Sequence, residues 1–179
     1  MSFLTTTTKL SHSSTLPEGT THSLALSMLS DYEFFLSCDP VLDSFTPLPP
    51  NPSPNLPSSI TSQIRTDAHQ QQGISYTVID IVHTTIWDSK VVSTYEFTDI
   101  TDGVFVRIKS PMGIVMDTVW QIREKQDKKG EWELVEDLEI RCNRLLVGVV
   151  KGQCEEGWGK IHGKMIKRLE DDIQKAAGK

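Results

Sequence analysis

Two stretches in the second half of the chain alternate between apolar and polar residues, which is the repeat of a half-buried β-strand. One face of residues 114–122 carries Ile114, Met116, Thr118, Trp120 and Ile122. One face of residues 132–140 carries Trp132, Leu134, Glu136, Leu138 and Ile140. Short turns connect these stretches to further strand-like segments, and such short connections favour antiparallel hairpins. The predicted strands are Ile74–His83, Val91–Thr98, Val104–Ser110, Ile114–Lys125 and Glu131–Cys142.

The last part of the chain changes to a helical repeat. Apolar residues recur at steps of one, three or four from Leu145 to about Ala176, which predicts one long C-terminal helix with an apolar stripe. Each glycine inside this pattern costs about 1 kcal/mol relative to alanine. We therefore expect that the sheet or a ligand approaches the helix closely, or that the helix kinks. The glycines are Gly148, Gly152, Gly157, Gly159 and Gly163.

The first part of the chain predicts a strand followed by two short helices. Residues 3–13 are rich in threonine and serine and suit a first strand. Thr15 and Glu18 match a capping box, which predicts a helix that ends near Leu29. Residues 30–33 match a second capping box, so a new helix begins there and ends before the Asp39-Pro40 pair.

A proline-rich segment follows a further predicted strand at Val41–Pro47. Six of the nine prolines lie between Pro47 and Pro57, and residues 47–72 offer no regular pattern. A connection of this length is uncommon inside a domain, so it is either a lid or a disordered insertion. Without it, the chain is typical of a compact α+β domain.

Composition narrows the class of protein. A chain of 179 residues suits a single domain, 1–179, that buries its own core. The 18 basic and 24 acidic side chains give a net charge of −6, which opposes nucleic-acid binding. The longest apolar run, Leu145–Val150, is far shorter than the ~20 residues of a membrane-spanning helix. Cys38, Cys142 and Cys154 are an odd number without CxxC spacing, and no signal peptide precedes them, so we expect free thiols and a cytoplasmic protein.

No cofactor or metal motif stands in the sequence. Residues 157–163 read GxGxxxG, which is one residue too long for a dinucleotide fingerprint and has no strand before it. The five histidines show no paired ligand spacing, so we expect neither a metal nor a cofactor. His83, at a strand end, and His162, beside the helical stripe, are candidate bases near neutral pH.

The order of elements resembles the helix-grip fold of the START and polyketide-cyclase superfamily, and a fungal START-like family of largely unknown function in particular. The resemblance covers nearly the whole chain. It implies a curved antiparallel sheet wrapped around the C-terminal helix, with a cavity for a hydrophobic small molecule between them. The segments that carry it are Asp31–Phe35, Asp39-Pro40, Tyr95–Asp99, Asp102-Gly103, Ser110–Gly113, Leu134–Glu136 and Arg141–Leu146.

Glu136 is the residue that breaks its pattern, because it lies on an apolar face between Leu134 and Leu138. A carboxyl group facing an apolar cavity has a raised pKa and can act as a general acid or a hydrogen-bond donor. The alternatives are an ion pair with Arg107, Lys109 or Arg144, or a bulge that turns the side chain outward.

Two hydroxyl groups and a set of apolar side chains complete the candidate site. Thr118 and Tyr95 can donate a hydrogen bond to a substrate carbonyl, or they are ordinary core hydroxyls. The candidate pocket walls, for which a solid core is the alternative, are Phe35, Phe97, Met116, Trp120, Leu134, Leu138, Val150, Cys154, Trp158 and Met165.

Three functions compete at this point. The first is a cofactor-independent cyclase or isomerase of fungal secondary metabolism, acting on a hydrophobic polyketide or terpenoid, with an intramolecular Diels–Alder closure as an example. A shaped pocket favours such a closure through proximity, and a hydrogen bond to a carbonyl polarises the substrate. The second is a carrier or sensor of a lipid, a sterol or another hydrophobic molecule. The third is an interaction module with a packed interior.

Overall fold

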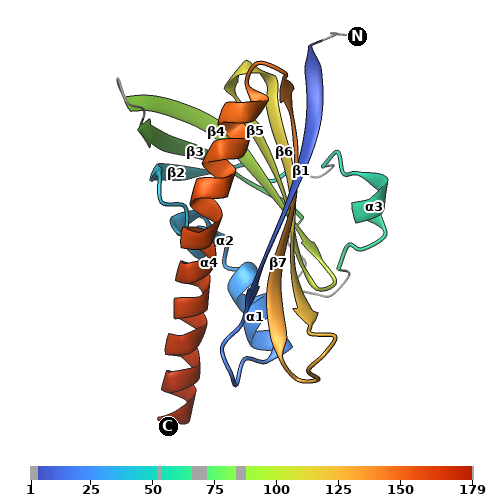
Figure 1. The fold of residues 1–179 in the computed structure, drawn as a ribbon, viewed down its shortest axis with the longest axis vertical. Helices are drawn as coiled ribbons and strands as arrows, with labels where there is room; N and C mark the ends of the chain where they lie inside the picture. The colour runs from blue at the N-terminus through green and yellow to red at the C-terminus, as the bar shows by residue number, and fades with distance from the viewer. Residues whose placement is uncertain (1–3, 52–53, 66–71, 84–87, 179) are drawn as a thin grey trace.

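The computed structural model describes residues 4–51, 54–65, 72–83 and 88–178. Within these residues, seven strands form one antiparallel sheet in the order β1-β7-β6-β5-β4-β3-β2. The sheet curls around the long helix α4 (Val147–Ala177), which crosses its concave side (Figure 1). The strands are β1 (Thr5–Thr15), β2 (Leu42–Leu48), β3 (Gln72–His83), β4 (Asp88–Ile100), β5 (Gly103–Ser110), β6 (Ile114–Glu124) and β7 (Trp132–Asn143). This arrangement confirms the predicted helix-grip fold.

Two short helices carry the chain from one edge of the sheet to the other. Helix α1 (His22–Leu29) begins at the N-cap Thr21, and α2 (Tyr32–Ser37) begins at the N-cap Asp31. The two adjoining helices were predicted, but both capping boxes were assigned wrongly. Thr15 ends β1 instead of starting a helix, because its backbone pairs with β7. A short 3₁₀ turn, η1 (Pro111–Gly113), joins β5 to β6.

Helix α4 is continuous over 31 residues, so the predicted kink is wrong. The expected close approach of the sheet to the glycines is also wrong. A side chain added at Gly148, Gly152, Gly157, Gly159 or Gly163 meets nothing within 4 Å. These glycines lie on the open side of α4, while its stripe of Val150, His162, Met165 and Leu169 is buried. None of the described helices has the length and apolar character needed to cross a membrane.

The described part of the proline-rich segment packs on the convex face of the sheet. Residues 54–65 contain a short helix, α3 (Ser58–Thr61), and Figure 1 shows it on the side of the sheet away from α4. Ile60 packs with Ile100 and Phe105, which belong to that convex face. The segment is also more regular than predicted, since β2 runs through Pro47 to Leu48 and pairs with β3.

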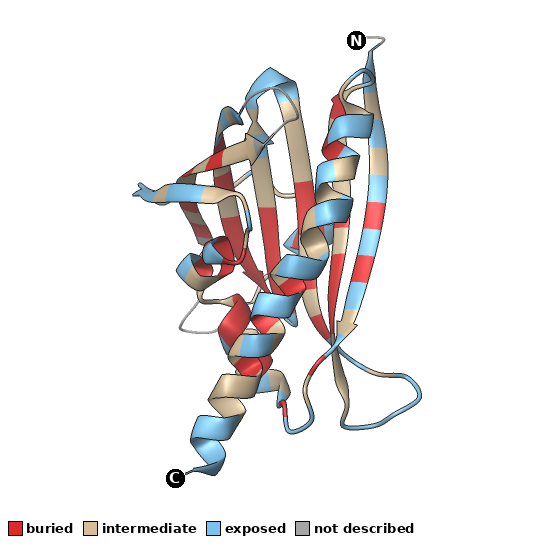
Figure 2. Ribbon diagram, turned by 60° about the vertical axis from the view of Figure 1, so that its left-hand side comes forward, coloured by how far each residue is buried: buried red, intermediate tan, exposed pale blue. Residues whose placement is uncertain are grey.

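The concave face holds two separate apolar clusters. One surrounds Phe97, which stacks on Tyr32 and meets Phe35 edge-on. The other contains Leu10 and Leu138 near the first turns of α4. Figure 2 shows buried positions in bands across the strands, in the part of the sheet that faces α4. Two buried polar side chains, His12 on β1 and Glu136 on β7, lie opposite each other on the concave face and form the candidate site.

Candidate active site

A histidine and a glutamate face each other between the sheet and α4. The register of β1 and β7 places His12 opposite Glu136, and alternation turns both side chains toward the helix. Nδ1 of His12 lies 2.9 Å from Oε2 of Glu136. Both residues are only 8% exposed. The predicted inward position of Glu136 is thus correct, and its polar partner comes from the other end of the chain.

Helix α4 holds the same imidazole from the opposite side. Nε2 of His12 lies 3.3 Å from Oε2 of Glu155. The indole of Trp158 stacks on the ring at a centroid distance of 4.7 Å. Each ring nitrogen therefore faces a carboxyl oxygen, so either His12 is an imidazolium that donates to both or one of the carboxyl groups carries the proton. Because the Glu155 side chain is 45% exposed, this chain of contacts runs from buried Glu136 to the surface.

Burial raises the pKa of Glu136, and the hydrogen bond with His12 opposes that rise. The second carboxyl oxygen, Oε1, has no hydrogen-bond partner among the described residues. A buried carboxyl group with one oxygen held by a histidine is suited to taking up and returning a proton.

His162 lies next to this pair, but it is more deeply buried and its pKa is lowered. It is 1% exposed, and its Nδ1 lies 2.8 Å from Oγ of Ser14. Its ring centroid is 5.3 Å from those of Trp120 and Trp158. Burial, and then the charge of His12, lower the pKa of His162 to about 4. The ring is therefore neutral near pH 7 and is too weakly basic for the role of base that the sequence suggested.

The structure separates the two predicted hydroxyl donors. Thr118 lies on β6 diagonally across from Glu136, since Trp120 is directly opposite Glu136 and Thr118 is opposite Leu138. Diagonal neighbours in an antiparallel pair have Cα atoms about 7–8 Å apart, so Thr118 is close to the carboxyl group. Tyr95 lies three strands away, on β4. Neither hydroxyl group makes a hydrogen bond within the described residues.

Cys154 lies on α4 between these polar groups. The negative charge of Glu136 contributes to the raised pKa of its thiol, and the thiol contributes to the raised pKa of Tyr95. Burial, followed by Glu136, raises the pKa of the Cys154 thiol to about 12. The thiol stays protonated near neutral pH and is a poor nucleophile there. Cys154 packs against the apolar cluster near the start of α4.

The other predicted wall residues fall into the two apolar clusters. The cluster around Phe97 includes Phe35, Trp120, Leu134 and Met165. Leu138 and Val150 belong to the cluster near the start of α4, with Met116 and Cys154 packed against it. Trp158 stands apart from both, on the His12 ring. Most of the predicted wall residues are thus packed in the apolar clusters between the sheet and α4.

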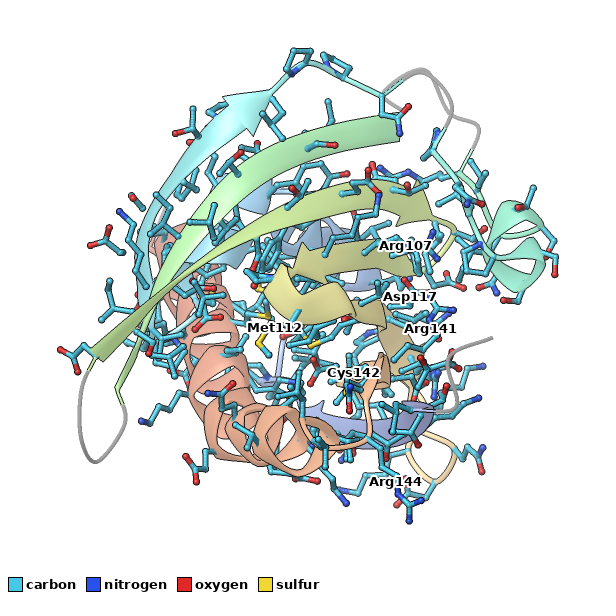
Figure 3. All side chains as sticks on the ribbon, turned by 90° about the horizontal axis from the view of Figure 1, so that it is seen from above. Arg107, Met112, Asp117, Arg141, Cys142 and Arg144 are labelled. Carbon is cyan, nitrogen blue, oxygen red and sulfur yellow. The ribbon has the colours of Figure 1, made fainter. Side chains whose placement is uncertain are left out.

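The predicted alternatives for Glu136 are wrong. Arg107 pairs with Asp117 through Nε, at 2.6 Å, and Arg141 pairs with the same carboxylate at 2.7 Å. Lys109 pairs with Glu96. Figure 3 shows Arg107, Asp117 and Arg141 together on the side of the sheet away from α4, and the strand register places Glu136 on the opposite face. Glu136 pairs with His12 rather than with Arg107, Lys109 or Arg144.

Sequence reasoning missed His12, Ser14 and Glu155. A signal for the first existed, because His12 shares its strand face with Leu10, which the alternation of β1 places inward. Glu155 gave no signal, since it lies on a charged part of α4. The side chain of His83, the other candidate base, lies outside the described residues. Within the described residues, no three histidine, cysteine, aspartate or glutamate side chains have the geometry of a metal site.

Comparison with known proteins identifies a sequence family for the chain and solved structures that share its fold. The sequence profile of a family described as "Domain of unknown function (DUF7053)" matches residues 5–171. No curated protein sequence matches the chain.

Three solved structures share the fold. The Zhui aromatase/cyclase from Streptomyces sp. R1128 is 10% identical, with a TM-score of 0.61 over 94% of this chain and 96% of that one. Ara h 8.0201 is 10% identical, with a TM-score of 0.58 over 93% and 99% of the two chains. A conserved protein from Geobacillus kaustophilus is 13% identical, with a TM-score of 0.59 over 92% and 96%. At these identities the likeness concerns the fold.

Proposed function

We propose that this chain, which belongs to the DUF7053 family of unknown function, is a cofactor-independent cyclase or isomerase of a hydrophobic carbonyl compound. The observation that carries the proposal is the buried His12–Glu136 pair, in which Nδ1 of the histidine lies 2.9 Å from one oxygen of the carboxyl group. Apolar side chains from the sheet and α4 surround the pair. The resemblance in fold to a protein named an aromatase/cyclase supports the same class of reaction.

The residues suggest a step based on proton transfer. Oε1 of Glu136 takes a proton from the carbon beside a substrate carbonyl group, and Thr118 donates a hydrogen bond to the enolate oxygen. The enolate carbon attacks a second carbonyl carbon in the same molecule, which forms a carbon–carbon bond and leaves an alkoxide. The alkoxide takes the proton back from Glu136. The product is an isomer of the substrate, so the step consumes no second reactant.

His12 and Glu155 have separate roles in this scheme. His12 stabilises the negative charge on Glu136 by donating a hydrogen bond from Nδ1. Glu155 accepts from Nε2 and is exposed, so a proton can pass between the buried carboxyl group and solvent through the ring. His12 thus sets how readily Glu136 accepts a proton, and Glu155 exchanges that proton with solvent. Neither residue has to touch the substrate.

The substrate class in this proposal is a polyketide- or terpenoid-type molecule of fungal secondary metabolism. A pericyclic, Diels–Alder-type closure is the alternative reaction in the same space. That closure needs shape and a hydrogen bond from Glu136, Thr118 or Tyr95, but no base, and the amide of a Glu136→Gln variant can still donate that hydrogen bond. A substitution of Glu136 therefore separates the two reactions, because it abolishes the proton transfer and leaves a pericyclic step largely intact.

A non-catalytic carrier of a lipid, sterol or similar molecule is the second candidate, and exposed apolar side chains favour it. Leu145, in the turn before α4, and Val149, in its first turn, are 82% and 62% exposed. Met112, in the turn between β5 and β6, is 75% exposed and has a positive φ of 62°. Large apolar groups displayed at the end of a domain suit contact with a membrane or a hydrophobic ligand.

Hydrogen exchange into a hydrophobic ketone tests the catalytic proposal without knowledge of the natural substrate. We expect the protein in heavy water to accelerate deuterium uptake by 2-undecanone at the carbons beside its carbonyl group, as followed by mass spectrometry. Glu136→Gln should abolish the acceleration. Asp137→Asn is the matched control, because Asp137 is the next residue of β7 and pairs with Arg123 on the other face. Equal rates with and without protein, despite binding of the ketone, would favour the carrier.

A further inference from the structure

Asp80 is a buried carboxyl group that has no partner among the described residues. It lies on β3 two positions from Val78, which alternation places on the concave face. The residue is 8% exposed, and its Oδ1 is fully buried with no hydrogen bond. Within the described part of the chain, no lysine, arginine or histidine forms an ion pair with Asp80.

The other buried carboxyl groups in the described part of the chain all have partners. Asp99 accepts a hydrogen bond from the Tyr32 hydroxyl and pairs with Arg65. Asp117 pairs with two arginines, and Glu136 pairs with His12. A buried polar group without a partner costs free energy, and native proteins contain few of them. Asp80 is therefore an exception that calls for a missing partner.

The surroundings of Asp80 are acidic and face the same interior as the candidate site. Burial raises the pKa of the Tyr95 hydroxyl, and the charges of Asp80, Asp39 and Cys154 raise it further. Tyr95 lies on β4, Asp39 at the corner after α2 and Cys154 on α4. Burial, and then Asp39, raise the pKa of Asp80 to about 7. Lys164 acts on Asp39, while no cation is among the charges that act on Asp80.

We infer that Asp80 binds the protonated amine of a hydrophobic ligand held between the concave face and α4. The inference rests on the proposed function for the binding space, and it adds the polar group that the ligand carries. An alkylammonium offers three donors and a positive charge, which satisfies both oxygens of Asp80 and the acidic surroundings together. An alcohol offers one donor and no charge, and a carboxylate is repelled.

Binding of three probes with the same alkyl chain tests the inference. The probes are dodecylamine, 1-dodecanol and dodecanoate, titrated at pH 8 below their micelle concentrations and followed by calorimetry. We expect the amine to bind at least about tenfold more tightly than the alcohol, since a charge-assisted hydrogen bond contributes that much. Dodecanoate should bind most weakly.

Two variants assign the effect to Asp80. Asp80→Asn should lower the affinity for the amine to that for the alcohol and leave the alcohol unchanged. Asp43→Asn, a substitution at an exposed position of β2, is the matched control and should change neither. Equal affinities of amine and alcohol for the unmodified protein would overturn the inference while leaving a hydrophobic site in place. If none of the three probes binds, both the inference and the proposed function fall.

Discussion

The ring of His12 lies parallel to the indole of Trp158, with an interplanar angle of 5° and 4.7 Å between the ring centroids. The stack joins the first strand to the last helix and fixes the plane of the imidazole. With the plane fixed, Nδ1 points at Glu136 and Nε2 at Glu155. The acid–base pair therefore depends on a residue that carries no charge.

Trp158→Leu should slow the exchange of 2-undecanone by about tenfold, because stacked aromatic pairs contribute about 0.5–1.5 kcal/mol to holding a ring in place. Trp158→Phe retains an aromatic face and should recover most of the rate. Rates are compared at equal ketone saturation, so that a weaker affinity is not mistaken for slower chemistry. Identical rates for the leucine and phenylalanine variants would contradict this role of the stack.

Glu155→Gln should slow the exchange of protons between the site and solvent while leaving ketone affinity unchanged. The amide still accepts a hydrogen bond from His12, but it cannot take up a proton. A small carboxylic acid buffer such as acetate should restore part of the rate by replacing the lost group. Glu156→Gln, at the neighbouring exposed position of α4, provides the control. A rate that is insensitive to both the substitution and the buffer would remove Glu155 from the proton path.

Asp80 should make the protein less stable as the pH rises. Its pKa is about 7 in the folded protein and 3.8 in an unfolded chain, so folding favours the protonated form. The stability linked to Asp80 is thus fully present below about pH 4 and is lost as the pH rises through 7. Asp80→Asn should raise the free energy of unfolding at pH 8 by on the order of 2–4 kcal/mol and change little at pH 4. Urea unfolding at both pH values measures this, and a pH-independent effect would argue against a protonated Asp80.

His162 should have the opposite dependence on pH. Its pKa is about 4 in the folded protein and 6.5 in an unfolded chain, so the unfolded state binds the proton more readily. Stability linked to His162 is present above pH 6.5 and is lost as the pH falls toward 4. His162→Gln should make unfolding less sensitive to acid in that range, by about 2–3 kcal/mol between its ends. Thermal unfolding at pH 7 and pH 4.5 would show it, and parallel losses in both proteins would contradict the assignment.

Ile60→Ala should destabilise the protein without affecting the site. Ile60 is buried with Ile100 and Phe105 on the convex face, so the substitution leaves a cavity that costs about 2–4 kcal/mol. The face that bears His12 and Glu136 lies on the other side of the sheet, so the rate of ketone exchange should stay the same in protein that is still folded. A lost rate with unchanged stability would mean that residues 54–65 act on the site.

Local sequence determined the main elements and their inward faces. Alternation along β6 and β7 placed Thr118, Trp120 and Glu136 on the apolar side, because side chains in a strand turn to opposite faces at every step. The apolar stripe of α4 likewise predicted that Met165 and Leu169 are buried. The starting residues of the helices could not be predicted in the same way, since Thr15 has the same local pattern whether it ends a strand or starts a helix.

Only the tertiary structure decided which polar groups meet. His12 and Glu136 are separated by 124 positions, and they meet because β1 joins the sheet beside β7. No local repeat specifies which edge a first strand joins or in which register, since that depends on closing the sheet around α4. The same closure buries Asp80 without a partner among the described residues and brings Glu155 to His12. The sequence by itself determined an inward-facing Glu136, and the folded structure supplied the histidine that makes it an acid–base pair.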